Sequence, residues 1–293
     1  MILVTGGTGT TGYFVICELL RRGIAVRAFT RLSSAKRLEN LEIEIALGDL
    51  ADIDSLGRAV EGVRGIIHTA CTFKNAGIDQ AAMSALLDAW KEGPFVFVSS
   101  VDVYGAPLYL PLDEIHPLNS TGTDYGDGKV RCEALLRTKA EQCGRTDWSI
   151  LRPPHIWGPH HSCAKKIVQQ YQKIWAGEAV PLASPTAKHK LPLGDGWIDA
   201  RELGWVAAEC LERPLTEAAN IVNSHFTWEE LYQELIQLTG SMSIIEPSSD
   251  VTGIYAVAWQ YDGSRLVEHL GFQPKYNWRD TLAEAVSLLM LSS

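Results

Sequence analysis

The sequence predicts an α/β fold in which a doubly wound parallel sheet is followed by a smaller α+β lobe at the C-terminus. Two observations predict the sheet. Short apolar segments alternate with segments of helical periodicity through residues 1–152, and the first apolar segment ends at a glycine-rich turn. A third observation predicts the lobe, because proline, glycine and histidine become frequent after residue 152 and the alternation loosens. Helices are expected on both faces of the sheet, since parallel strands are joined by right-handed crossovers.

The first strand and the first helix give the clearest signal. Residues 2–4 are apolar, Gly6, Gly9 and Gly12 follow with a GxxGxxG spacing, and residues 13–22 have helical periodicity. The same patterns predict further strands at residues 25–29, 43–46, 65–68, 95–98 and 148–151, and helices at residues 54–60, 79–90 and 124–142.

The second half of the chain is predicted with fewer elements. Its patterns indicate helices at residues 165–175, 200–211 and 227–238, and a strand at residues 220–223. Thr227 is a plausible N-cap of the last of these helices, because Glu230 follows three residues later. We expect residues 1–152 to form the main domain, with residues 197–223 returning to it. Residues 153–196 and 224–293 are expected to form the smaller lobe.

Composition excludes several classes of function. The chain has 46% hydrophobic and 21% charged residues, typical of a globular protein, and its net charge of −9 argues against nucleic acid or an anionic membrane as partner. No apolar run approaches the roughly 18 residues of a membrane span, and a strand from residue 2 leaves no room for a signal peptide. Six scattered cysteines without a CxxC pair indicate reduced thiols and a cytoplasmic location. His160 and His161 lack metal-ligand spacing, so no metal is expected.

The glycine turn indicates a dinucleotide site. Glycines let the backbone approach a pyrophosphate, and a helix N-terminus favours negative charge. Arg31 stands near the end of the second strand, where an acidic residue would bind the ribose of NAD, and its planar guanidinium suits the 2′-phosphate of NADP. Asp49 follows the third strand and is placed to meet the adenine amino group. The alternative explanations are a plain glycine turn, a solvated arginine and a turn-forming Gly-Asp pair.

Tyr125 and Lys129 are the catalytic candidates. Four residues apart on a helix, they share one face. A nearby ammonium favours the phenolate and lowers the phenol pKa from its usual value of about 10. Ser100 follows the apolar strand at residues 95–98, where its hydroxyl can hold a substrate oxygen while Tyr125 moves a proton. Each feature also occurs by chance, Ser100 as a capping serine, but their combination favours proton transfer beside a hydride donor.

Several motifs together resemble the extended short-chain dehydrogenase/reductase family, also called the NAD-dependent epimerase/dehydratase family. They are TGGTGTTG at 5–12, GDLAD at 48–52, SSVDVYG at 99–105, PLDE at 111–114, YGDGK at 125–129, LRPPHIWGP at 151–159, DARELG at 199–204 and LGFQP at 270–274. The resemblance implies a Rossmann-type dinucleotide-binding domain with a C-terminal substrate lobe. It also implies that Tyr125 is the acid/base, that Lys129 lowers its pKa and binds the nicotinamide ribose, and that Ser100 completes the catalytic set.

The patterns and the resemblance together define the expected contacts. Cofactor contacts are expected from Gly6, Thr8, Gly9, Thr10, Thr11, Gly12, Arg31, Asp49, Leu50, Thr69, Ala70, Tyr125, Lys129, Pro153 and His155. Substrate contacts are expected from Thr72, Asp102, His155, Trp157 and Lys190.

Two departures from the family pattern bear on the substrate. His155 stands where the family's nucleotide-sugar enzymes carry an asparagine that contacts the diphosphate, and the segment Gly194-Asp195-Gly196 replaces an arginine. VRAFTR at 26–31 also resembles the VRATVR of the family's NADP-dependent carbonyl reductases. We therefore expect an oxidoreductase that favours NADP(H) over NAD(H) and acts on the carbonyl or alcohol of a small molecule lacking a nucleotide diphosphate.

Two alternatives remain open. One is an epimerase or dehydratase of a sugar or nucleotide-sugar, in which the same residues oxidise the substrate transiently. The other is a non-catalytic NADP-sensing module, although such relatives usually lose the tyrosine and lysine that this chain keeps. Two-fold dimers are common in the family, so the resemblance also makes a homodimer an expectation.

Overall fold

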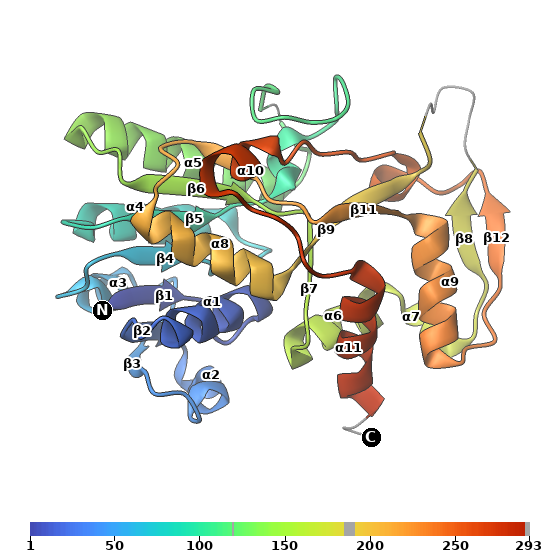
Figure 1. The fold of residues 1–293 in the computed structure, drawn as a ribbon, viewed down its shortest axis with the longest axis horizontal. Helices are drawn as coiled ribbons and strands as arrows, with labels where there is room; N and C mark the ends of the chain where they lie inside the picture. The colour runs from blue at the N-terminus through green and yellow to red at the C-terminus, as the bar shows by residue number, and fades with distance from the viewer. Residues whose placement is uncertain (119, 185–190, 291–293) are drawn as a thin grey trace.

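The computed structural model describes residues 1–118, 120–184 and 191–290. At its centre is a parallel seven-stranded sheet in the order β10-β6-β5-β4-β1-β2-β3 (Figure 1). Its strands are β1 (Ile2–Thr5), β2 (Val26–Thr30), β3 (Glu44–Leu47), β4 (Ile66–His68), β5 (Phe95–Val98), β6 (Trp148–Arg152) and β10 (Ala218–Asn220). The order reverses between β1 and β4, and such a switch point opens a crevice at the carboxyl ends of the strands. The predicted fold class is confirmed.

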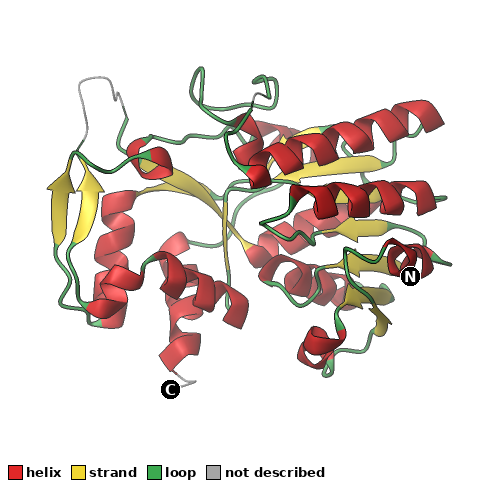
Figure 2. Ribbon diagram, turned by 180° about the vertical axis from the view of Figure 1, so that it is seen from behind, coloured by secondary structure: helices red, strands yellow, loops and turns green. Residues whose placement is uncertain are grey.

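Helices cover both faces of this sheet (Figure 2). One layer consists of α1 (Thr10–Arg21), α8 (Ala200–Glu212) and α10 (Ser264–Leu270), and the other of α3 (Ile53–Val60), α4 (Ala76–Ala89) and α5 (Asp124–Cys143). In β5, Val96 and Val98 pack toward the first layer and Phe95 and Phe97 toward the second. Alternate residues of a strand point to opposite faces, so a continuous apolar run is what a strand buried on both sides requires.

The C-terminal half contains two small sheets. β7 (His155–Trp157), β9 (Gly194–Asp199) and β11 (Ser224–Thr227) form one, and β8 (Val180–Ala183) pairs with β12 (Ile245–Ser248) to form the other. The helices beside them are α6 (His161–Gln170), α7 (Gln172–Ala176), α9 (Trp228–Thr239) and α11 (Trp278–Met290). This half has its own core, built around Trp157, Trp197, Phe226, Trp228 and Trp278. Short helical segments are α2 (Leu32–Ala35), η1 (Lys36–Leu38), η2 (Val101–Tyr104) and η3 (Gly253–Ala256).

Two predicted elements of the C-terminal half are wrong. Residues 165–175 form two helices instead of one, because the backbone of Tyr171 leaves the helical region at φ −116° and ψ 34°. Residues 220–223 are not a strand, since pairing with β6 begins at Ala218 and β10 ends at Asn220. The side-chain Nδ2 of Asn220 donates to the carbonyls of Leu112 and Asp262 (both 3.0 Å), which fixes the chain where it leaves the sheet. The predicted cap of α9 is confirmed, with reciprocal bonds between Thr227 and Glu230.

The sequence pattern also missed β7, β8, β9, β11 and β12. β9 contains two glycines, which are poor strand formers, but the tertiary structure requires them. A Cβ at Gly194 would lie 2.0 Å from the carbonyl oxygen of Phe226 on the paired strand, and one at Gly196 would lie 2.8 Å from the Tyr261 ring. The segment 197–223 was expected to return to the main domain. Its first residues, 197–199, lie in the small sheet of β7, β9 and β11, whereas α8 and β10 pack with the large sheet. The division into two domains stays a prediction.

No helix in the described parts of the chain is both long enough and apolar enough to cross a membrane.

Candidate active site

A cavity of about 1020 Å³ lies at the carboxyl ends of β1, β2, β4 and β5 and extends to β7. Of the predicted site residues that the structure describes, all line it except Pro153. Pro153 is buried behind the wall, where its carbonyl accepts a hydrogen bond from the Val101 amide (3.1 Å), and Pro154 lines the cavity instead. Lys190 lies outside the described residues. The cavity therefore gathers residues from most of the motifs that were separated along the sequence.

The glycine turn after β1 is packed so closely that side chains would not fit. Gly6 has φ +74°, and a Cβ there would lie 2.7 Å from Thr69 Oγ1. A Cβ at Gly12 would lie 2.3 Å from the Gly6 carbonyl oxygen. α1 begins beyond Gly9 with no side-chain cap and no acidic residue in its first turn. Its first N–H groups are therefore available to an anion, and the turn fits a dinucleotide pyrophosphate.

The two arginines of β2 and its end have different surroundings. Arg27 donates to Glu44 Oε1 (2.6 Å) and to the carbonyls of Ala59 (2.9 Å) and Glu61 (2.6 Å). Arg31 is exposed, lines the cavity, and has no side-chain hydrogen bond or ion pair among the described residues. Arg27 is thus committed to holding β2 and β3 together, and Arg31 is the cation left for a ligand phosphate.

Ser100, Tyr125 and Lys129 line the same cavity. Ser100 Oγ accepts a hydrogen bond from the Asp102 amide (3.2 Å), and Lys129 Nζ donates to the Val98 carbonyl (2.8 Å). Lys129 Nζ also lies 5.7 Å from the centre of the Tyr125 ring. The strand end and the helix therefore place the three predicted catalytic residues together, and their roles stay predictions.

The electrostatics of Tyr125 differ from the sequence expectation. Burial raises the pKa of the phenol well above its usual value, nearby Cys71 and Asp102 add to this, and a hydrogen bond with Ser100 opposes it. Lys129 was expected to lower this pKa, but it does not do so here. Its ammonium donates a hydrogen bond to the Val98 carbonyl and lies over the face of the Tyr125 ring. The surroundings of Tyr125 therefore favour the protonated phenol.

The local sequence explains how α5 presents these groups. Thr123 caps the helix by accepting a hydrogen bond from the Gly126 amide (3.0 Å). Gly126 leaves no room for a side chain, since a Cβ would lie 2.3 Å from Thr121 Oγ1. At Gly128 a Cβ would lie 3.0 Å from the Cβ of Ala76, so the missing side chain lets α4 approach α5.

The substrate end of the cavity contains a histidine–carboxylate pair. His155 Nε2 lies 3.1 Å from Asp195 Oδ2, and Asp195 Oδ1 accepts a hydrogen bond from the Tyr261 hydroxyl (3.0 Å). Burial alone would lower the pKa of His155, but Asp195 and Asp102 reverse this and raise it. Desolvation by the surrounding cavity also raises the pKa of Asp102. Trp157 is 4% exposed, and its ring centroid lies 6.1 Å from that of His155. Trp157 also belongs to the C-terminal core, so it connects this end of the cavity to that core.

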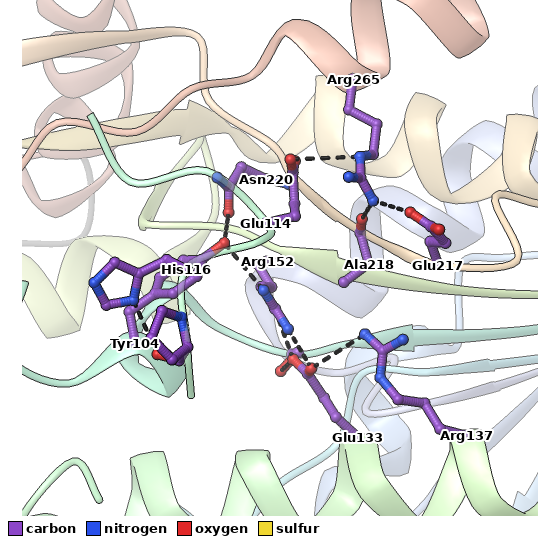
Figure 3. A network of polar contacts seen from close by, with 12 residues as sticks. Tyr104, Glu114, His116, Glu133, Arg137, Arg152, Glu217, Ala218, Asn220 and Arg265 are labelled. Atoms are coloured by element: carbon purple, nitrogen blue, oxygen red, sulfur yellow. Dashed lines mark hydrogen bonds and ion pairs between the residues drawn. The ribbon is translucent and has the colours of Figure 1, made fainter. Parts of the chain in front are cut away.

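A buried polar network behind Ser100 was not predicted from the sequence (Figure 3). Arg152 forms two hydrogen bonds with Glu133 (3.0 and 2.6 Å), and Ser99 Oγ donates to the same carboxylate (2.6 Å). Arg152 Nη1 also donates to the Tyr104 hydroxyl (3.0 Å), which donates to Asn220 Oδ1 (2.6 Å). The network fixes the chain on both sides of Ser100. The SSVDVYG and LRPPHIWGP motifs contain three of its members, which is the signal that could have revealed it.

The cavity is also lined by residues that were not predicted, and Cys71, Phe73 and Lys166 are three of them. Phe73 stacks on the Tyr125 ring with centroids 5.3 Å apart and planes 19° apart. None of the three belongs to a motif, so only the tertiary structure identifies them. In the described parts of the chain, no group of three or more histidine, cysteine or acidic side chains is arranged to hold a metal ion.

Comparison with protein families agrees with this geometry. The model of the NAD dependent epimerase/dehydratase family matches residues 2–196, which is more than half of the 293 residues. The chain belongs to this family. Proteins of the NAD dependent epimerase/dehydratase family bind a nicotinamide dinucleotide, and the matched region includes the glycine turn, Tyr125 and Lys129.

Individual proteins and solved structures are also similar to this chain. A UDP-glucose 4-epimerase from Haemophilus influenzae is 31% identical over 185 residues, covering 55% of this chain and 54% of that protein. The chain thus spans about half the length of the curated relatives it matches. A UDP-glucose 4-epimerase from Thermotoga maritima, solved with UDP-glucose, has the same fold (TM-score 0.84, 20% identity, 99% of both chains). A short-chain dehydrogenase/reductase superfamily protein from Agrobacterium tumefaciens, solved with bound NAD, is 25% identical (TM-score 0.77, 100% of this chain and 97% of that one).

Proposed function

We propose that this protein is an enzyme that uses a nicotinamide dinucleotide to oxidise or reduce a hydroxyl- or carbonyl-bearing carbon of a small molecule. One observation carries the proposal. A single cavity contains both the closely packed glycine turn and the cluster of Ser100, Tyr125 and Lys129. A hydride can therefore be exchanged with the carbon of a bound substrate while a proton is exchanged with the oxygen on that carbon, which is what this reaction requires.

The position of each cavity residue indicates its role in this reaction. The glycine turn and the N-terminus of α1 would hold the pyrophosphate, Asp49 the adenine and Lys129 the nicotinamide ribose. When bound, the dinucleotide supplies or accepts the hydride. Ser100 holds the substrate oxygen. Tyr125, whose pKa burial raises, donates its proton to that oxygen in reduction and takes it back in oxidation.

We further propose that NADP(H) is preferred over NAD(H). The support is Arg31, which lines the cavity and has no other side-chain partner among the described residues. A guanidinium pairs with the oxygens of a 2′-phosphate through two parallel hydrogen bonds. NAD has no 2′-phosphate, so Arg31 forms no such hydrogen bonds with it and adds nothing to its affinity.

A second candidate function is epimerisation of a nucleotide-sugar, in which the substrate is oxidised transiently and reduced again. Its support is the match to a UDP-glucose 4-epimerase at 31% identity. Against it stand His155 and Asp195, which put a carboxylate in the substrate end of the cavity. The similarity to UDP-glucose 4-epimerases supports a nucleotide-sugar substrate. This support is stronger than the support that His155 and Asp195 give to a substrate without a nucleotide. The homodimer and the cytoplasmic location remain proposals as well.

The test is a substrate screen with matched variants. Alcohols and carbonyl compounds are assayed with NADP(H) and NAD(H), and UDP-glucose is assayed for conversion to UDP-galactose. Tyr125→Phe keeps the ring and removes the hydroxyl, so turnover should fall roughly 100-fold or more while dinucleotide binding survives. Lys129→Met should weaken both. Full activity of Tyr125→Phe would refute the mechanism.

Thermal stability separates the two substrate classes. A ligand at a concentration 100 times its dissociation constant raises the free energy of unfolding by about 2.7 kcal/mol. A clear rise of the melting temperature with UDP-glucose would select the epimerase candidate. No rise, together with turnover of a simple alcohol or carbonyl compound, would select the first.

A further inference from the structure

Phe73 has an unusual backbone conformation at the mouth of the cavity. Its φ of +61° lies in the left-handed region, which bulky residues seldom adopt. The loop around it is tied down, because the amide and hydroxyl of Thr72 both donate to the Asp79 carboxylate (2.8 and 3.0 Å) and the Asn75 amide donates to Thr72 Oγ1 (3.0 Å). Strain of this kind persists where surrounding contacts fix it, and it is concentrated at functional sites.

The ring of Phe73 lies between two groups of the cavity. On one side it stacks on Tyr125 (5.3 Å between centroids), and Lys166 Nζ lies 4.3 Å from its centroid. Phe73 follows β4 of the large sheet, whereas Lys166 belongs to α6 of the C-terminal half. Phe73 itself is 52% exposed, so its ring lies between the Tyr125 ring and solvent only on the face that it stacks on. A cation over an aromatic face is attracted to it, and Lys166 thereby opposes rotation of the ring.

We propose that Phe73 is a positioning residue whose ring covers Tyr125 and limits its contact with water, and that Lys166 holds this cover in place. The proposal rests on the proposed acid/base role of Tyr125. Its consequence is electrostatic: removing the ring would admit water, reduce the desolvation that raises the pKa of Tyr125, and make the phenolate easier to form.

The experiment measures the reactivity of Tyr125 in the full chain without any substrate. Tetranitromethane nitrates phenolates, and peptide mass spectrometry locates the modified tyrosine. Phe73→Ala removes a largely exposed side chain, so the fold should be retained. Nitration of Tyr125 should accelerate, by about tenfold for each unit by which its pKa falls. Phe73→Tyr keeps the stacked ring and should protect Tyr125 as the native residue does.

Two neighbouring lysines provide a matched pair. Lys166→Gln removes the cation over the ring and should accelerate nitration of Tyr125 less than Phe73→Ala does. Lys165→Gln changes a lysine that is also exposed but does not line the cavity, and it should leave the nitration rate of Tyr125 unchanged. Acceleration by Lys166→Gln alone supports its role as the holding contact, whereas equal rates in the two variants refute that role.

The outcomes separate this proposal from the proposed function. If Tyr125 of Phe73→Ala is nitrated at the native rate, or if Phe73→Tyr exposes it as much as Phe73→Ala does, the cover does not exist. If a substrate is turned over, Phe73→Ala should move the ionisation of Tyr125 in the pH–rate profile to lower pH, and an unmoved profile refutes the influence on catalysis. If no substrate is turned over but the nitration rates are as expected, the proposed function is refuted and the proposal that Phe73 covers Tyr125 still holds.

Discussion

At the scale of residues, the partners of a side chain decide its role more than its type does. Arg27 and Arg31 both come from the second strand or its end, yet Arg27 is bonded to Glu44 and two carbonyls while Arg31 faces the cavity. The sequence analysis assigned the phosphate contact to Arg31, and the structure leaves its guanidinium without a side-chain partner among the described residues. Lys129 shows the same principle, since its ammonium is held by the Val98 carbonyl rather than by the phenol it was expected to activate.

The first prediction concerns cofactor choice. Arg31→Ala should narrow the difference in affinity between NADPH and NADH, because a charge-assisted hydrogen bond contributes about 1.5–3 kcal/mol and only NADPH forms it. Fluorescence titration of both cofactors measures the difference. Arg37→Ala is the control, since Arg37 does not line the cavity. NADH binding as tightly as NADPH in the native protein would overturn the assignment.

The second prediction concerns the pH dependence of His155. Asp195→Asn removes the charge 3.1 Å from its Nε2 atom and should lower the pKa of His155, which Asp195 and Asp102 together raise against the effect of burial. A histidine whose pKa rises on folding adds stability that is complete below its unfolded value of about 6.5. This contribution is lost as the pH rises through the folded pKa, and the variant should lose it at a lower pH.

An NMR titration of the His155 ring measures this directly. Individual rings must be resolved, because burial lowers the pKa of His68 to about 3 and that of His160 to about 4, so these groups act on stability in the opposite sense. Asp102→Asn serves as comparison and should shift the midpoint less than Asp195→Asn, since Asp102 makes the smaller contribution. An unshifted midpoint in Asp195→Asn contradicts the assigned pairing.

At the scale of elements, prediction succeeded where local signals agree with the tertiary structure. β5 was recognisable because its apolar run is buried on both faces, and the start of α1 because glycines precede a periodic segment. β9 was missed because its glycines oppose strand formation and are explained only by contacts with Phe226 and Tyr261. Phe73 was missed for a related reason, since its importance comes from a residue 52 positions away.

The third prediction tests the glycine turn with two glycines of opposite surroundings. Gly12→Ala should greatly weaken dinucleotide binding and destabilise the fold by about 1–3 kcal/mol, because its Cβ would lie 2.3 Å from the Gly6 carbonyl. Gly57→Ala lies within α3, where a Cβ meets nothing within 4 Å. It should stabilise the protein by about 0.5–1 kcal/mol. Urea unfolding and cofactor titration measure both, and equal behaviour of the variants would refute the steric account.

At the scale of the whole molecule, the active site depends on contacts between distant parts of the chain. The cavity lies between the large sheet and β7 of the C-terminal half, and the network of Figure 3 joins α5, β6, η2 and β10 behind it. The sequence predicted the cavity residues because their motifs are local. It did not predict that Arg152 binds Glu133 or that Tyr104 binds Asn220, because these partners are 19 and 116 positions apart and no local pattern pairs them.

The last prediction is that this network stabilises the fold as well as the site. Glu133 is fully buried and Arg152 is 1% exposed, so Glu133→Gln leaves a buried guanidinium without its counter-charge. The free energy of unfolding should fall by about 3–5 kcal/mol, measured by urea denaturation. Arg137→Gln is the control, because Arg137 reaches the same carboxylate only at 3.9 Å from a 43% exposed side chain, and such a pair contributes at most about 1 kcal/mol. The double variant Glu133→Leu/Arg152→Met should lose less than the sum of its two single variants, since neither charge is then left unpaired. Additive losses would show that the two residues act independently and that the network is not a unit.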